Sequence, residues 1–278
     1  MALTRFAPSP TGYLHLGHAA SACHVWRAAE ALSAPVKLRI EDIDHTRCRP
    51  EYEDAIVADL TRLGFEWDGP IRRQSDHLDD YADAISFLQQ AGLIYRCFQT
   101  RQGIELARAN SPDPAAPYTG APLSARAEQA HLDAGDRYAW RLSLRNAREY
   151  LGDAYETLCF TEISPDGPTV QPAQPERHGD VILARKDINT SYHIACCHDD
   201  ALQAITHVVR GEDLHDVTHI HVLLQALMGW PQPLYQFHPL MLGPDGQKLS
   251  KRNQDKSLHT FWLEGVTPAQ IRRMTGFE

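Results

Sequence analysis

Two histidines near the amino terminus have the spacing expected of a phosphate-binding helix start. His15 and His18 lie three residues apart, directly after the turn Pro8-Ser9-Pro10-Thr11-Gly12. Side chains three apart on a helix share a face, so both imidazoles can donate to one phosphate while the helix amino terminus adds partial positive charge. An isolated pair would more often be a helix cap and a surface residue, but the preceding turn favours phosphate binding. The residues that we predict to contact ATP here are Pro10, Thr11, Gly12, His15, Gly17 and His18.

A short run of cations near the other end of the chain can bind the same phosphates. Lys248-Leu249-Ser250-Lys251-Arg252 follows the turn Gly243-Pro244-Asp245-Gly246. A lysine ammonium is a compact charge on a flexible stem, suited to following a departing pyrophosphate. A P-loop is excluded because Leu249 stands where Ser or Thr would bind magnesium. We predict ATP contacts from Lys248, Leu249, Ser250 and Lys251, and we assign the catalytic role to His15, His18, Lys248 and Lys251.

The elements that must position these residues alternate along the chain. Apolar periodicity predicts strands at residues 4–7 and 36–40, and helices from Leu16 to before Pro35, at residues 50–63 and at residues 77–91. Gly64 and Gly92 stand directly after the last two helices, as is typical of helix ends. This β-α-β-α order predicts an α/β fold with a doubly wound parallel sheet.

The middle of the chain has a different character. Residues 109–124 and 164–178 are rich in proline and glycine, and we interpret both as loops. Further strands are expected at residues 180–184, 205–210 and 234–242, and a helix at residues 217–228. The predicted divisions are residues 1–92 and 179–245 for the two halves of the core, 93–178 for an inserted α+β subdomain, and 246–278 for a loop with a short helical segment.

The composition excludes several classes of protein. A formal net charge of -9 argues against a generally basic nucleic-acid coat, although a local basic patch remains compatible with it. The cysteines have no regular spacing, and the adjacent pair Cys196-Cys197 is poorly suited to a disulfide. No segment resembles a signal peptide or reaches the ~18 apolar residues of a membrane span. We therefore expect a cytoplasmic protein, and we expect it to be a monomer.

Four sequence blocks resemble the glutamate-specific branch of the class I aminoacyl-tRNA synthetases. They are residues 5–18, 38–44, 205–214 and 248–252, which occur in the family's order over essentially residues 3–255. The segments His15–His18 and Lys248–Arg252 are similar to the family's HIGH and KMSKS elements. The resemblance implies a Rossmann-type core that activates an amino acid with ATP and Mg²⁺.

The resemblance points to glutamate as the amino acid, and the residue types agree with it. Glutamate presents one ammonium, which Glu41 and Ser9 can hold, and two carboxylates, which fit the planar guanidinium groups of Arg5 and Arg210. Which arginine takes the side-chain carboxylate stays open. Without its neighbours, the acidic segment that begins at Glu41 would be read as an exposed strand end or a magnesium site. The predicted glutamate-binding residues are Arg5, Ala7, Ser9, Glu41, Tyr192 and Arg210.

The sequence departs from a full glutamyl-tRNA synthetase after its second phosphate-binding segment. It stops at Glu278, shortly after Arg252, so we expect no anticodon-binding domain. This combination resembles truncated paralogues that activate glutamate without tRNA and transfer it to queuosine. The partners implied are L-glutamate, ATP and the anticodon stem-loop of tRNA(Asp) carrying queuosine. Two alternatives stay open: a minimal enzyme that charges the acceptor end, and a non-catalytic regulator that binds tRNA or an amino acid.

A zinc site is not expected. Relatives hold zinc in the insertion through two cysteines, a tyrosine and a further cysteine. Here Gln99 and Pro122 replace two of these four ligands and leave Cys97 and Tyr118. We interpret Cys196-Cys197-His198 as the interior end of a strand rather than a metal site. The sequence therefore predicts no metal ligands.

Overall fold

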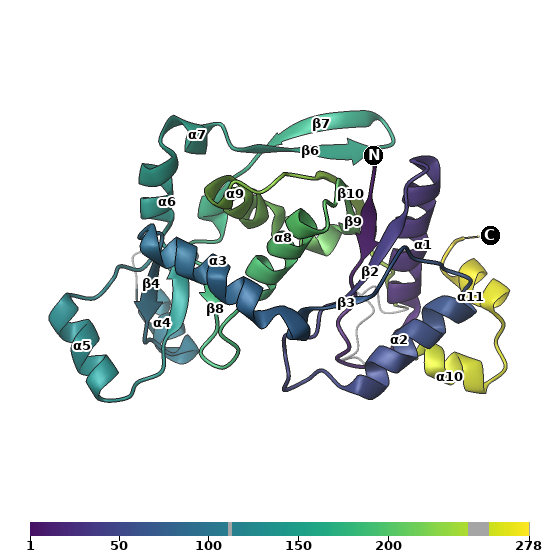
Figure 1. Ribbon diagram of the computed structural model, residues 1–278, viewed down its shortest axis with the longest axis horizontal. Helices are drawn as coiled ribbons and strands as arrows, with labels where there is room; N and C mark the ends of the chain where they lie inside the picture. The colour runs from purple at the N-terminus through teal and green to yellow at the C-terminus, as the bar shows by residue number, and fades with distance from the viewer. Residues whose placement is uncertain (111–112, 244–255, 278) are drawn as a thin grey trace.

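The computed structural model describes residues 1–110, 113–243 and 256–277 (Figure 1). Its first part is a parallel sheet in the order β1-β2-β3. The strands are β1 (Thr4–Phe6), β2 (Val36–Ile40) and β3 (Arg72–Arg73). The helices are α1 (Leu16–Ala31), α2 (Pro50–Arg62) and α3 (Leu78–Gln90). The predicted β-α-β-α order is confirmed.

A second sheet has the order β7-β6-β10-β9, in which β6, β10 and β9 run parallel. The strands are β6 (Cys159–Ser164), β7 (Gly167–Pro172), β9 (His207–Gly211) and β10 (Leu234–His238). The backbone amides of Thr206 and His207 donate to the Leu3 carbonyl at 2.9 and 3.0 Å. Since these bonds link the start of β9 to the start of β1, the two parallel sheets continue one another as a doubly wound core. The predicted fold class is confirmed.

The inserted region carries an antiparallel sheet in the order β4-β5-β8, on the left in Figure 1. Its strands are β4 (Ile94–Cys97), β5 (Ala139–Leu142) and β8 (Ile182–Ala184). The helices that accompany it are α4 (Arg101–Ala109), α5 (Ala125–Asp133), α6 (Leu144–Leu151) and α7 (Asp153–Glu156). This region therefore has the α+β character predicted for it.

One loop prediction and one sheet assignment in the middle of the chain are wrong. Residues 164–178, predicted as a loop, contain β7, and its prolines Pro168 and Pro172 give this strand the proline content of a loop. Because β7 is an edge strand, prolines remove no hydrogen bond that the sheet needs. Residues 180–184, predicted as a core strand, form β8, which pairs with β5 of the insertion. Apolar residues indicate a strand without specifying its partner. As a result, β8, which follows residue 178, pairs with β5 of the insertion, and β6, which precedes residue 178, pairs with β10 of the core.

Helices α8 (Tyr192–Leu202) and α9 (Thr218–Met228) pack on each other, and α8 also packs on α3. The segment Cys196-Cys197-His198, predicted as the end of a strand, therefore lies inside a helix. Most of α8 is buried, so no polar face reveals its helical period. Helix α9 ends at Gly229 in the left-handed conformation with φ of 64°, as the sequence predicts.

The helices α10 (Leu258–Leu263) and α11 (Pro268–Met274) lie beside α1 and α2, on the right in Figure 1. Leu258, Ile271 and Phe277 join the hydrophobic core beneath β1 and β2. The indole nitrogen of Trp262 donates to Asp59 Oδ1 at 2.6 Å. Nowhere in the described part of the chain is a helix both long and apolar enough to cross a bilayer.

Candidate active site

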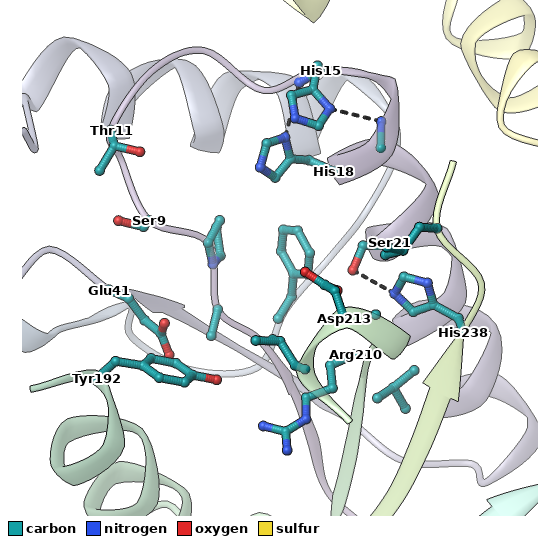
Figure 2. Close-up of a pocket in the computed structure, with 18 of the residues that line it drawn as sticks. Ser9, Thr11, His15, His18, Ser21, Glu41, Tyr192, Arg210, Asp213 and His238 are labelled. Atoms are coloured by element: carbon teal, nitrogen blue, oxygen red, sulfur yellow. Dashed lines mark hydrogen bonds between the residues drawn. The ribbon is translucent and has the colours of Figure 1, made fainter. Parts of the chain in front are cut away.

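A cleft of about 990 Å³ opens at the carboxyl ends of β1 and β9, where the two parallel sheets meet (Figure 2). At such a point in a doubly wound fold, the connections leave toward opposite faces of the sheet, and a ligand site forms between them. The walls come from β1 and its following loop, from the first turns of α1, and from the carboxyl ends of β2, β9 and β10. The first residue of α8, Tyr192, closes one side.

The cleft gathers most of the residues predicted from the sequence. All six predicted glutamate-binding residues line it: Arg5, Ala7, Ser9, Glu41, Tyr192 and Arg210. Four of the predicted ATP contacts also line it: Thr11, His15, Gly17 and His18. Pro10 and Gly12 are not part of its wall, and the carbonyl of the buried Pro10 accepts from the Arg49 amide at 3.1 Å. Lys248, Leu249, Ser250 and Lys251 lie outside the described residues.

His15 and His18 stand at the start of α1, at the top of the cleft in Figure 2. The Nδ1 of His15 accepts from the Gly17 amide at 3.1 Å, and the Nδ1 of His18 accepts from the His15 amide at 3.2 Å. A neutral imidazole whose Nδ1 accepts carries its proton on Nε2, so each ring is an Nε2–H donor. This reciprocal cap fixes the tautomer of both rings at a helix amino terminus, where partial positive charge favours a phosphate.

The described residues on both sides of residues 244–255 lie near these histidines. Leu240 and Met241 line the cleft. Ser257 forms a β-bridge with His15, and the Leu258 amide donates to the Leu14 carbonyl at 2.7 Å. The predicted phosphate-binding lysines belong to the residues between these two positions, and their contact with ATP stays a prediction.

Arg5 lines the cleft as a buried, ion-paired side chain. Its Nε donates to Oδ1 of Asp200 at 3.1 Å, and Arg39 donates to the same oxygen. Burial alone would raise the pKa of Asp200, but the guanidinium groups of Arg5 and Arg39 outweigh it and hold the pKa below its usual range. Because Nε is anchored in this way, Arg5 can offer its terminal NH₂ groups to a ligand carboxylate.

Arg210, near the end of β9, is fixed by contacts on two sides. One terminal nitrogen donates to Thr218 Oγ1 at 2.6 Å, and the other lies 3.4 Å from His221 Nδ1. Burial, and then the charge of Arg210, hold the pKa of His221 well below its usual value, so this imidazole is neutral and accepts. Within the described structure, the buried Nε of Arg210 has no hydrogen-bond partner. A ligand carboxylate would satisfy this donor.

Glu41 and Tyr192 lie across the cleft from the histidines (Figure 2). Burial raises the pKa of Glu41 to about 7, although Arg39 and Arg5 act to lower it. Burial also raises the pKa of Tyr192 well above its usual value, so the phenol stays protonated. A carboxyl group that titrates near neutral pH becomes ionised when an ammonium binds beside it.

Several residues of the cleft were absent from the sequence prediction. His238 is the last residue of β10, and its Nε2 lies 3.0 Å from Ser21 Oγ on α1. Asp213 follows the end of β9 and also lines the cleft. Because ligands bind beyond the carboxyl ends of parallel strands, the strand end predicted at residue 210 was a usable signal for Asp213. His238 lies inside the predicted strand 234–242, which ends four residues earlier in the structure, so it gave no such signal. Asp200 offered no such signal, since it lies in a helix and its partners lie on distant strands.

Cys97 and Tyr118, the two residues that remain of the zinc-ligand pattern considered in the sequence, lie in one packed cluster. Cys97 packs with Tyr95, Ile104 and Tyr118, and the Tyr95 hydroxyl donates to Asp180 Oδ2 at 2.9 Å. Within residues 1–110, 113–243 and 256–277, no three His, Cys, Asp or Glu side chains are grouped so as to hold a metal ion. The absence of zinc from the protein stays a prediction.

Comparison with known proteins defines the class to which this fold and cleft belong. Residues 1–274 match the family described as tRNA synthetases class I (E and Q), catalytic domain. The chain therefore belongs to this family of class I aminoacyl-tRNA synthetases, and it is a ligase that uses ATP. Within the family, it is 42% identical to the glutamyl-Q tRNA(Asp) synthetase of Rhodobacter capsulatus, over 99% of both chains. The predicted resemblance is confirmed.

Relatives that charge tRNA with glutamate are longer. The chain is 34% identical to the glutamate–tRNA ligase of Aquifex aeolicus, over 96% of this chain and 55% of that protein. A crystal structure of a glutamate tRNA ligase from Elizabethkingia meningosepticum in complex with its amino acid aligns with a TM-score of 0.73 and 29% identity. The alignment covers 91% of this chain and 52% of the other. The chain thus spans about half the length of these ligases.

Proposed function

We propose that the protein activates L-glutamate with ATP and transfers the glutamyl group to queuosine in the anticodon loop of tRNA(Asp). The observation that carries this proposal is the gathering of Arg5, Arg210 and Glu41 in one cleft with His15 and His18. These charges complement a dicarboxylic amino acid next to a polyphosphate. Relatives named glutamyl-Q tRNA(Asp) synthetase, which the chain matches over 99% and 83% of their lengths, support the acceptor.

The cleft suits each charged group of glutamate. In the proposed complex, Glu41 and Ser9 hold the ammonium, and Arg5 and Arg210 each bind one carboxylate. Tyr192 covers the substrate with a protonated phenol. Since both arginines lie in buried surroundings, their charge-assisted hydrogen bonds are stronger than they would be in water.

The activation step joins a glutamate carboxylate oxygen to the α-phosphorus of ATP and breaks the bond to pyrophosphate. Negative charge moves toward the leaving pyrophosphate, so donors that already point at it lower the barrier. His15 and His18 supply two Nε2–H donors at the amino terminus of α1. Lys248 and Lys251 are proposed to neutralise the pyrophosphate, and Mg²⁺ enters as part of the MgATP substrate.

In the transfer step, a hydroxyl of the queuosine cyclopentene ring attacks the glutamyl carbonyl, and AMP leaves. An unpaired loop nucleotide can swing out of its stack and enter a cleft at a lower cost than a duplex base, which must first lose its base pair. Arg47, Arg49 and Tyr52 line the cleft and are suited to an RNA loop, since cations bind phosphates and aromatic rings stack on bases.

Exchange of labelled pyrophosphate into ATP tests the activation step without tRNA. We expect the wild-type protein to catalyse this exchange only when glutamate is present. Lys251→Ala should lower the exchange rate by about 100-fold or more while it leaves glutamate affinity unchanged, because its charge acts on the leaving group. A wild-type protein without exchange would contradict the proposed activity, and normal exchange by Lys251→Ala would contradict the role of this lysine.

Mass spectrometry of tRNA nucleosides distinguishes the possible acceptors. After incubation with ATP and labelled glutamate, we expect the label on the queuosine nucleoside of tRNA(Asp). tRNA(Asp) prepared without queuosine is the control and should stay unlabelled. Label on the terminal adenosine of a glutamate tRNA would instead identify an enzyme that charges the acceptor end.

A further inference from the structure

Two neighbouring aspartates in α8 bind one arginine from each strand of the first sheet. Asp200 accepts from Arg5 of β1 and Arg39 of β2, and Asp199 accepts from Arg72 of β3 at 2.9 Å. Both aspartates are almost completely buried. The last turns of α8 are therefore bound to all three parallel strands through ion pairs away from solvent.

Only the first of these ion-pair groups reaches the cleft. Asp200 contacts Arg5, which lines the cleft. The partners of Asp199, besides Arg72, are the Gln74 side-chain amide at 3.1 Å, the Tyr81 hydroxyl at 2.9 Å and Nδ1 of His198 at 3.2 Å. None of these four partners is among the residues that line the cleft. The two aspartates thus lie on the same helix, are buried to a similar degree and both pair with arginine. They differ in that only Asp200 has a partner that lines the cleft.

The Asp200 carboxylate determines which edge of Arg5 faces a ligand. Because Nε of Arg5 donates to Oδ1 of Asp200 at 3.1 Å, the guanidinium plane is held from its inner edge. Arg39 holds Asp200 in turn and has no exposed surface. Helix α8 also carries Tyr192 at its first residue, so one rigid element sets the relative position of Arg5 and Tyr192.

We propose that Asp200 is a positioning residue that promotes glutamate recognition by holding Arg5. The proposal rests on the function proposed above, and it adds a residue that does not itself touch the substrate. An arginine that is held in the bound geometry loses less rotational freedom when it binds a carboxylate, so the affinity for the amino acid increases.

The charge of Asp200 also affects the proton on Glu41. Among the described residues, the ionisable groups that interact electrostatically with Glu41 are Arg5, Arg39, Asp199, Asp200, Tyr192 and Cys196. The phenol and the thiol are neutral, since burial raises the pKa of Tyr192 and Cys196. Removal of the Asp200 charge leaves Arg5 and Arg39 with less compensation. The loss of a negative charge and the stronger net effect of the two guanidinium groups both favour the ionised form of Glu41, so the pKa of Glu41 should fall.

Asp200→Asn and its matched control Asp199→Asn test this inference in glutamate-dependent pyrophosphate exchange. For Asp200→Asn we expect the KM for glutamate to rise at least tenfold, with the KM for ATP and kcat changed less than threefold. The acidic midpoint of the pH profile of the glutamate KM should move to lower pH by at least half a unit. For Asp199→Asn we expect a glutamate KM within twofold of the wild-type value, because its partners do not line the cleft.

Asp200→Glu covers the possibility that Asp200→Asn does not fold. It retains the charge and displaces Arg5 by the length of one methylene, so we expect a glutamate KM raised about fivefold and an unchanged pH midpoint. A wild-type KM in either Asp200 variant, or an equal rise in Asp199→Asn, would overturn the role of Asp200. A wild-type protein that shows no exchange at all would overturn the proposed function, and the role of Asp200 with it.

Discussion

At the scale of single residues, the unusual group is Glu41, a carboxyl buried among two arginines and two aspartates. Its burial raises its pKa to about 7, whereas the nearby His193 has a pKa lowered to about 4 by burial. Glu41 is therefore a cleft group whose charge changes near neutral pH. Since an ammonium pairs with a carboxylate and not with a carboxylic acid, glutamate binding must take up the cost of ionising Glu41 at low pH.

This gives a signed pH dependence for glutamate affinity. Above about pH 7, Glu41 is ionised and the Kd for glutamate should be independent of pH. Below this value the protonated form predominates, so the Kd should rise about tenfold for each pH unit, which corresponds to about 1.4 kcal/mol. Isothermal titration calorimetry between pH 5.5 and 8 measures this slope. Glu41→Gln should bind weakly at every pH, and a wild-type Kd that is constant across the range would contradict the assignment.

Arg210 gives a second prediction at this scale. Replacement by Ala removes a planar charged donor pair, so the KM for glutamate should rise by about 100-fold or more, as expected for the loss of two charge-assisted hydrogen bonds. Arg210→Lys retains the charge without the planar fork and should recover only part of the loss. Arg177 is a suitable control, because it is half-exposed, pairs with Asp216 and does not line the cleft. An Arg210→Ala enzyme with normal KM would contradict the model of the site.

At the scale of elements, the start of α1 combines a structural and a chemical role in the same residue. His15 caps the helix through Nδ1, and the reciprocal bond from its own amide holds His18. A cap contributes about 1 kcal/mol of stability, whereas an oriented donor to a transition state contributes several times more. Stability and catalysis can therefore be separated by the choice of substitution.

His15→Asn and His15→Ala make this separation. Asparagine can still accept from the Gly17 amide, so the stability of His15→Asn should be within about 0.5 kcal/mol of wild type, while His15→Ala should lose about 1 kcal/mol. Both variants lack the Nε2–H donor, and both should lose about 100-fold in pyrophosphate exchange. Urea unfolding and exchange kinetics measure the two effects. Retained exchange by His15→Asn would show that His15 is a cap alone.

At the scale of the whole molecule, helices α10 and α11 complete the hydrophobic core beneath β1 and β2. Ile271 of α11 is fully buried in the cluster that contains residues of β1 and β2. Ile271→Ala should therefore destabilise the protein by about 2–5 kcal/mol, since it creates a cavity in a packed core. Met274 lies on the same helix and is 46% exposed, so Met274→Ala should cost less than about 1 kcal/mol. Equal unfolding midpoints for the two variants would contradict this packing.

The sequence predicted the helix boundaries of this molecule better than its strand partners. Pro50, Gly64 and Gly229 act through local backbone preferences, so the limits of α2 and α9 were readable. The pairing of β8 with β5, and of β6 with β10, depends on contacts between distant segments. The helical character of Cys196-Cys197 was hidden for a related reason, because a helix buried on most sides shows no periodic polar face.

By itself, the sequence determined the parallel α/β core, the glutamate-branch family and the selection of Arg5, Glu41 and Arg210 as charged residues of one site, because these depend on residue type and local spacing. Only the tertiary structure decided that Asp200 anchors Arg5, that Thr218 and His221 fix Arg210, and that Glu41 titrates near neutral pH. These properties arise from burial and from the proximity of charges on separate segments, and both exist only once the chain has folded.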